Sequence, residues 1–244
     1  MKRTSKSLLI ILFITVLGSC GIDTYIYMKP VNYSTVNWDA LNKQITFYLP
    51  TGQVEGYFNE YIIYYRLYHS DINKSLSIRI DEFSDISPQL FSDYSRINPY
   101  TTNSDSAPIL LQSLFESTLK YAMLTFATKV TSSEALSSIT TVGNPLDKLL
   151  ENEKVTIDFN LLASSLVHPT LSIGTASYRI LRSEVSGLIP SRDFLYSSSI
   201  AGDDVSNTSK QYVYVSFYIV AKGVDDSGTV ILSNATFLGV LQLP

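Results

Sequence analysis

Few residues of this 244-residue sequence have the types and spacing that catalysis or metal binding requires. The two histidines, His69 and His168, lie far apart, and neither has another His or a Cys at ligand spacing. Because metal sites usually need three or four clustered ligands, we expect no metal and no cofactor. Serines are numerous, but the Gly-x-Ser-x-Gly turn of α/β-hydrolases is absent. The sequence therefore offers no catalytic residue that can be named.

Two pairs of adjacent carboxylates, Asp203–Asp204 and Asp225–Asp226, provide the alternative chemistry. A glycosidase needs only two carboxyl groups across a cleft, and distance along the chain says little about such a pair. Both pairs lie in Gly-containing segments, where turn formation is the simpler interpretation. The segment GVDDSG also lacks the spaced aspartates of calcium loops. A polysaccharide hydrolase that uses paired carboxylates is kept as an alternative function.

The single cysteine, Cys20, directly follows an apolar run. Three basic residues precede this run, which covers residues 7–17 and is too short for the roughly 20 residues of a membrane span. The pattern is typical of an export signal. Residues 17–20, LGSC, resemble the bacterial lipobox, in which the cysteine is acylated and becomes the new N-terminus. The resemblance implies that residues 1–19 are removed and that Cys20 carries the lipid.

A lipobox implies an extracytoplasmic lipoprotein that is anchored to a membrane by palmitate-type chains. Gly21 follows the cysteine in place of the aspartate that favours inner-membrane retention, so the outer membrane is favoured. Periplasmic and surface-exposed locations both stay open. An ordinary signal peptide with an incidental cysteine is the alternative. Because a lipidated sulfur forms no disulfide, the mature chain must be stabilised by its core.

Charge and composition narrow the function classes. Without residues 1–19 the chain has 15 Lys and Arg against 22 Asp and Glu, with no basic cluster. Nucleic-acid binding usually needs such a cluster to neutralise phosphates, so we expect no nucleic-acid partner. A hydrophobic content of 45% with 16% charged residues excludes a disordered chain. We expect a tether over residues 20–35 and one folded domain over residues 36–244.

Alternating apolar residues predict a mainly β fold. The segment KQITFYLP (43–50) predicts a strand with one wet face, and YFNEYIIYYRLYHS (57–70) predicts one covered on both faces. Shorter strands are expected near 155–159 and 171–181, and a long closing hairpin over 211–244.

The pattern changes between residues 71 and 152, where we expect an irregular or helical insertion. Apolar residues at helical spacing after Pro108 predict a short helix. Its continuation KYAMLTFAT (120–128) fits a helix or a strand, and a second helix is expected near 80–94.

Together these elements predict an antiparallel β-sandwich with inserted loops and one or two short helices. The segment YFNEYIIYYRLY resembles the tyrosine-rich central strand of fibronectin type III domains, which are immunoglobulin-like. The segments YVYVSFYIVAKG and TFLGVLQLP resemble their last two strands. The combination is similar to a group of uncharacterised extracytoplasmic bacterial lipoproteins, and the resemblance covers the first and last thirds of the chain.

The 17 tyrosines are the remaining signal. Aromatic rings with a polar tip suit binding surfaces, although core packing and cross-strand pairing are the alternative interpretation. If a binding surface exists, we expect it on the less apolar face of the strands, from Tyr64, Tyr68, Tyr212, Tyr214 and Tyr218.

We therefore expect a membrane-anchored, non-enzymatic binding or structural module of the cell envelope. Its partners would be the membrane, through the lipid on Cys20, and an envelope protein or glycan. The polysaccharide hydrolase and a subunit of an envelope assembly stay as alternatives.

Overall fold

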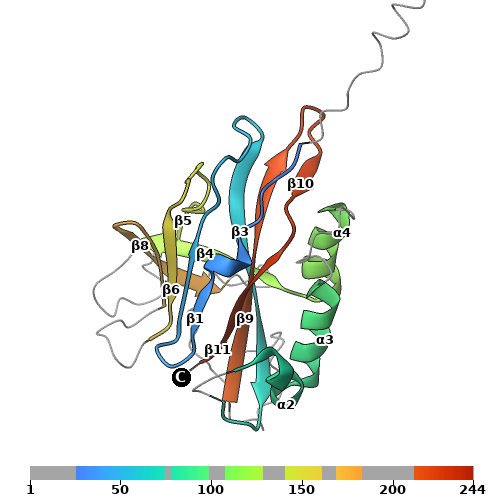
Figure 1. Ribbon diagram of the computed structural model, residues 1–244, viewed down its shortest axis with the longest axis vertical. Coiled ribbons are helices and arrows are strands. Elements are labelled where there is room, and N and C mark those ends of the chain that lie inside the picture. The colour runs from blue at the N-terminus through green and yellow to red at the C-terminus, as the bar shows by residue number, and fades with distance from the viewer. Residues whose placement is uncertain are drawn as a thin grey trace, which may run out of the picture.

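The computed structural model describes residues 26–74, 78–98, 108–128, 141–160, 169–182 and 212–243 (Figure 1). Strands dominate, and every strand pair in these ranges is antiparallel. The mainly β, antiparallel fold predicted from the sequence is confirmed. None of the helices in these ranges is both long enough and apolar enough to cross a membrane.

The described strands belong to one sheet of eleven. They are β1 (Asn37–Asp39), β2 (Gln44–Tyr48), β3 (Phe58–Ser70), β4 (Ala122–Thr128), β5 (Thr141–Val142), β6 (Lys154–Asp158), β7 (Thr170–Ile173), β8 (Ala176–Arg182), β9 (Tyr212–Val224), β10 (Val230–Leu232) and β11 (Thr236–Gln242). Their order is β1-β2-β6-β7-β8-β4-β3-β9-β10, while β11 pairs with β9 and β5 with β4. This number exceeds the seven strands of a constant-type immunoglobulin domain.

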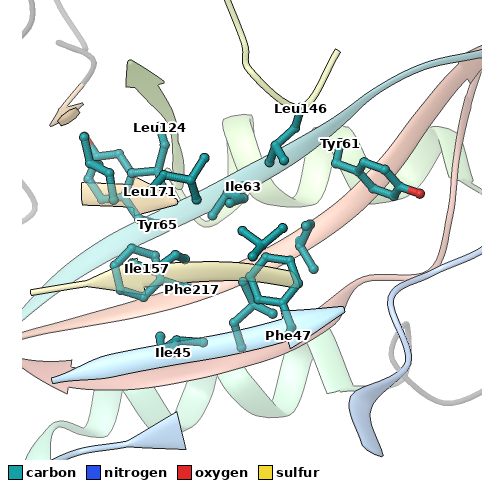
Figure 2. Close-up of a cluster of buried hydrophobic side chains, with 14 of the residues drawn as sticks. Ile45, Phe47, Tyr61, Ile63, Tyr65, Leu124, Leu146, Ile157, Leu171 and Phe217 are labelled. Atoms are coloured by element: carbon teal, nitrogen blue, oxygen red, sulfur yellow. The ribbon is translucent and has the colours of Figure 1, made fainter. Parts of the chain in front are cut away.

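The sheet curves until it is nearly closed, because β11 at one side comes back against β1 and β2 at the other. Its two halves pack face to face, as in a sandwich, around one apolar core. Ile45 and Phe47 of β2 and Ile157 of β6 face Phe217 of β9 across this core (Figure 2). The alternating pattern of residues 43–50 thus supplies buried side chains, as predicted.

Strands β3 and β9 run side by side for 13 residues each, from Phe58 opposite Gly223 to Ser70 opposite Tyr212. Tyr61 and Ile63 point into the core between the sheet halves. The alternate residues point to the opposite face, where Tyr64 is also fully buried. The prediction that β3 is covered on both faces is confirmed.

A layer of short helices covers this second face (Figure 1). It consists of η2 (Ile80–Glu82), α2 (Phe83–Ile86), α3 (Pro88–Ile97), α4 (Pro108–Ser113) and the π-helical turn η4 (Leu114–Thr118), whereas the 3-10 turn η1 (Tyr33–Thr35) belongs to the N-terminal segment. We call the first five the helical layer. Pro88 at the start of α3 needs no hydrogen-bond partner for its nitrogen, which suits a first helical turn.

The predicted insertion at residues 71–152 contributes to the sheet as well as to the helical layer. Residues 122–128, which the sequence left open between helix and strand, form β4. This strand pairs with β8 over five residues and with β3 over two. It therefore joins the two halves of the sheet, and a positive φ of 56° at Lys120 marks the change from helix to strand.

Candidate functional site

A group of polar side chains, most of them buried, lies between the sheet and the helical layer. We call it the polar cluster, and it consists of Arg66 and Tyr68 on β3, Asp93 on α3, Tyr121 before β4, and Ser216 on β9. The two-residue period of β3 places Arg66 and Tyr68 on its helix-covered face. Asp93 lies on the buried face of α3.

The Asp93 carboxylate accepts hydrogen bonds at both oxygens. Arg66 Nη1 and the Tyr68 hydroxyl donate to Oδ2, at 2.8 and 3.0 Å, and Gln89 Nε2 donates to Oδ1 at 2.7 Å. Arg66 also donates to the backbone carbonyl of Leu119. A carboxylate with no exposed surface is tolerated only when its oxygens are bonded in this way.

Three hydroxyl groups close the other half of the polar cluster. Those of Tyr68 and Tyr121 are 2.7 Å apart, Tyr121 and Ser216 are 3.0 Å apart, and Ser216 lies 3.3 Å from Tyr68. Burial raises the pKa of both tyrosines, so they stay neutral and can donate hydrogen bonds. The triangle links β3, β9 and the segment before β4.

Burial also raises the pKa of Asp93, although the nearby Arg66 guanidinium and the hydrogen bonds from Gln89 and Tyr68 oppose the shift. A raised pKa is often found at a catalytic acid or base, but buried ion pairs produce it too. Here the Asp93 side chain has no exposed surface, and its hydrogen-bond partners lie on β3 and α3. Its chemistry therefore serves to hold the helical layer on the sheet.

The structure brings four of the five predicted binding tyrosines into the interior. Register places Tyr64 opposite Tyr218, and Tyr68 opposite Tyr214, on neighbouring strands. All four side chains are buried beneath the helical layer, whereas Tyr212 is partly buried. As the protein is folded here, no partner can contact the four. The sequence did not show that helices cover this face.

These four tyrosines have internal contacts that explain their positions. The Tyr64 ring stacks on Phe115 with centroids 4.6 Å apart, and its hydroxyl donates to Glu116 at 2.9 Å. The Tyr214 hydroxyl donates to the carbonyl of Ile72 at 2.6 Å. Tyr218 packs edge-on against Tyr121, with centroids 5.6 Å apart. Aromatic pairing and hydroxyl bonding of this kind stabilise a core.

The other residues singled out in the sequence are dispersed. Cys20, His168, Asp203 and Asp204 lie outside the described residues. Asp225 Oδ1 accepts from the backbone nitrogens of Ser227 and Thr229, so the turn role predicted for it is confirmed. Asp226 accepts from the Tyr57 hydroxyl at 3.0 Å. In the described ranges, no three or more His, Cys, Asp or Glu side chains form a group that could hold a metal ion.

A second feature that sequence reasoning missed is the packing of residues 26–36, which we call the N-terminal strap. Met28 and Val31 are buried in the core between the sheet halves, inside the segment assigned to the tether. Gln53 accepts a hydrogen bond from Lys29 N at 2.9 Å and donates to Lys29 O at 2.7 Å. Thr236 donates to the carbonyl of Val31 at 2.6 Å. The strap is therefore tied to the sheet by its own backbone.

Comparison with known proteins assigns the chain to no family. No protein-family model matches it, and neither the curated proteins nor the solved structures gave a match. Its function is therefore inferred from its own residues.

Proposed function

We propose that this protein is a lipoprotein of the bacterial cell envelope that acts as a non-enzymatic binding or structural module. Its anchor is Cys20, and the outer membrane is favoured over the inner one. The sequence LGSC at residues 17–20, directly after an apolar run of export-signal type, carries the proposal. One acyl chain binds membranes only marginally, whereas the two or three chains implied by a lipobox hold a protein firmly.

The packing of the chain after the cysteine supports this proposal. The strap begins to contact the sheet at Ile26, and Met28 is already fully buried. Only the five residues 21–25 would thus separate a lipid on Cys20 from the folded body. The chain has a single cysteine and therefore no intrachain disulfide, so the stability of that body rests on two apolar clusters, one between the sheet halves and one beneath the helical layer.

The arrangement of the polar cluster favours a structural role over catalysis. Asp93 is the one carboxylate of the polar cluster, and its hydrogen bonds with other described residues come from Arg66, Tyr68 and Gln89. A glycosidase would instead place two carboxyl groups about 5 to 10 Å apart across a space for the sugar. We propose an envelope protein or glycan as the further partner of the module.

Metabolic labelling with a palmitate analogue tests the anchor. We expect label on the wild-type protein, none on Cys20→Ser, and unchanged label on the control Ser19→Ala, which keeps a small residue before the cysteine. Label that persists in Cys20→Ser would contradict the assignment. Cross-linking in intact envelopes, followed by identification of what is bound, then tests the partner class, and repeated recovery of the protein alone would count against a binding role.

A further inference from the structure

We propose that one end of the folded body faces a zwitterionic phospholipid surface at close range and contacts it through Tyr27 and Val54. We call this the tether end, and it consists of Tyr27, the loop 51–57 and the turn 225–229. The inference rests on the proposed anchor at Cys20 and adds the orientation of the body and the lipid chemistry that it meets.

The length of the chain limits how far the body can stand from its anchor. Five residues separate Cys20 from Ile26. An extended chain spans at most about 3.6 Å per residue, so Ile26 lies within about 22 Å of Cys20 whatever the conformation of this segment. The strap cannot lengthen the tether unless it leaves the core, since Met28 and Val31 are buried there.

The contacts of the strap show which end of the body is tethered. A Cβ on Gly223, at the end of β9, would meet the Met28 sulfur at 2.8 Å, so these two residues touch. The Lys29 ammonium donates to the carbonyl of Thr51 at 3.1 Å. The strap therefore begins beside the turn after β9 and the loop between β2 and β3, at the end of the sheet opposite α2 and the C-terminus (Figure 1).

The body is long compared with the tether. β9 has 13 residues, which at about 3.3 Å per residue is roughly 40 Å. Trp38 packs against Gly239, and Gly239 lies opposite Phe217 of β9. Phe217 is seven residues, or about 23 Å, from Val224 at the tether end. Leu41 lies three residues beyond Trp38, in the turn between β1 and β2. The tether end is thus held near the membrane, and Leu41 is directed away from it.

The exposed side chains of the tether end suit a neutral lipid interface. Tyr27 is 46% exposed and Val54 is 38% exposed. Tyrosine is enriched at the level of lipid headgroups, where its ring is partly desolvated and its hydroxyl stays wet. Glu55, Asp225 and Asp226 lie on the same loops and would be repelled by anionic lipids within a Debye length of about 10 Å. The ammonium groups of zwitterionic headgroups complement them.

Energy transfer from an added tryptophan to a dansyl-labelled lipid tests this orientation. Val54→Trp and Leu41→Trp are matched variants, because both replace an exposed apolar loop residue. Trp38 is the only natural tryptophan and contributes equally to both. The full chain is expressed, and the anchored protein is purified from membranes, checked for palmitate-analogue label and reconstituted into phosphatidylcholine vesicles. Tyr27→Trp replaces Val54→Trp if circular dichroism shows that the latter is misfolded.

With label present, we expect at least about twofold more energy transfer in Val54→Trp than in Leu41→Trp. The two added tryptophans would differ by tens of ångströms in their distance from the membrane surface. Ten Gly and Ser residues inserted after Ile22 would extend the reach by a further 15 to 20 Å or so and reduce the difference. Anionic lipid at one third of the total should lower the transfer measured in Val54→Trp.

Each other outcome contradicts a separate part of the proposal. Equal or reversed transfer in labelled protein overturns the orientation and leaves the lipoprotein assignment standing. Unchanged transfer with anionic lipid overturns the zwitterionic preference. Protein without label overturns the lipoprotein assignment and the orientation together.

Discussion

The Arg66 guanidinium donates to the Asp93 carboxylate at 2.8 Å, across the interface between β3 and α3. The Asp93 side chain has no exposed surface, and that of Arg66 is only 13% exposed. Desolvation of two charges cancels much of their attraction, so a buried pair adds little net stability even though loss of one partner is costly. The pair therefore sets the position of the helical layer on the sheet and contributes little to the free energy of unfolding.

Replacement of Asp93 by Ala should lower the free energy of unfolding by about 3 to 5 kcal/mol, because Arg66 is left buried without its counter-charge. Asp93→Asn keeps the size and one acceptor and should cost about 1 to 3 kcal/mol. The double variant Arg66→Met/Asp93→Leu should lie within about 1 kcal/mol of wild type. Urea unfolding measures all three, and a double variant as unstable as Asp93→Ala would contradict this account.

The pH dependence of stability should carry the signature of Asp93. Burial raises its pKa above the ordinary value of about 3.9, so the folded state holds this proton more tightly than the unfolded state. Its contribution to stability is then full below about pH 3.9 and is lost as the pH rises through the raised pKa. The difference in unfolding free energy between wild type and Asp93→Asn should shrink over that range. A difference that grows with pH would mean that Arg66 outweighs burial.

Much of the fold could be predicted because it depends on local patterns. Aliphatic and aromatic residues at both odd and even positions of 57–70 indicated a strand covered on both faces, and alternation in 43–50 indicated one buried face. The segment 120–128 could not be assigned, because its apolar residues fit either period. Pairing with β8 decides that it is a strand, and the paired residues lie 50 to 58 positions further along the chain.

The polar cluster could not be predicted from sequence. Arg66 and Asp93 are 27 residues apart, and only the packing of α3 on β3 brings them together. The sequence did indicate that Asp93 is buried. Asp93 follows Leu90 by three residues in a segment expected to be helical, so both side chains share one face of the helix. The burial of four of the five tyrosines could not be predicted for the same reason. Their polar hydroxyl groups fit a binding surface, and the pattern of the strands does not show that helices cover this face.

Gly239→Ala should destabilise the seam where β11 meets β1. A Cβ there would lie 2.9 Å from the Trp38 ring, and the φ of 139° is strained for any side chain. We expect a loss of about 2 to 4 kcal/mol, from overpacking and backbone strain together. Red-shifted emission of Trp38, the only tryptophan, should accompany it.

Gly56→Ala is the matched control for this seam. Gly56 also has a positive φ, of 87°, but nothing lies within 4 Å of the added Cβ. It should lose only about 1 kcal/mol with unchanged emission. Equal losses in the two variants would show that backbone strain, and not contact with Trp38, decides the effect.

The hydrogen bonds between Gln53 and the strap should control how firmly the tether is fixed. Gln53→Ala removes the partner of both Lys29 N and Lys29 O. Because the backbone groups of Lys29 then lack a partner in the folded state, opening of the strap should become easier by about 1 to 3 kcal/mol. Local opening of this kind need not involve the long β3–β9 pair.

Hydrogen exchange separates local from global effects in this variant. The Lys29 amide should exchange about 10- to 100-fold faster in Gln53→Ala, while amides of β9 such as Phe217 change much less. Gln112→Ala is the control, since the bonds of Gln112 to Glu116 are solvent-exposed and its loss should change neither rate. Faster exchange at Phe217 by the same factor as at Lys29 would mean that the strap opens only when the whole sheet unfolds. In that case the tether is fixed by the global stability of the sheet, and Gln53 has no separate part in it.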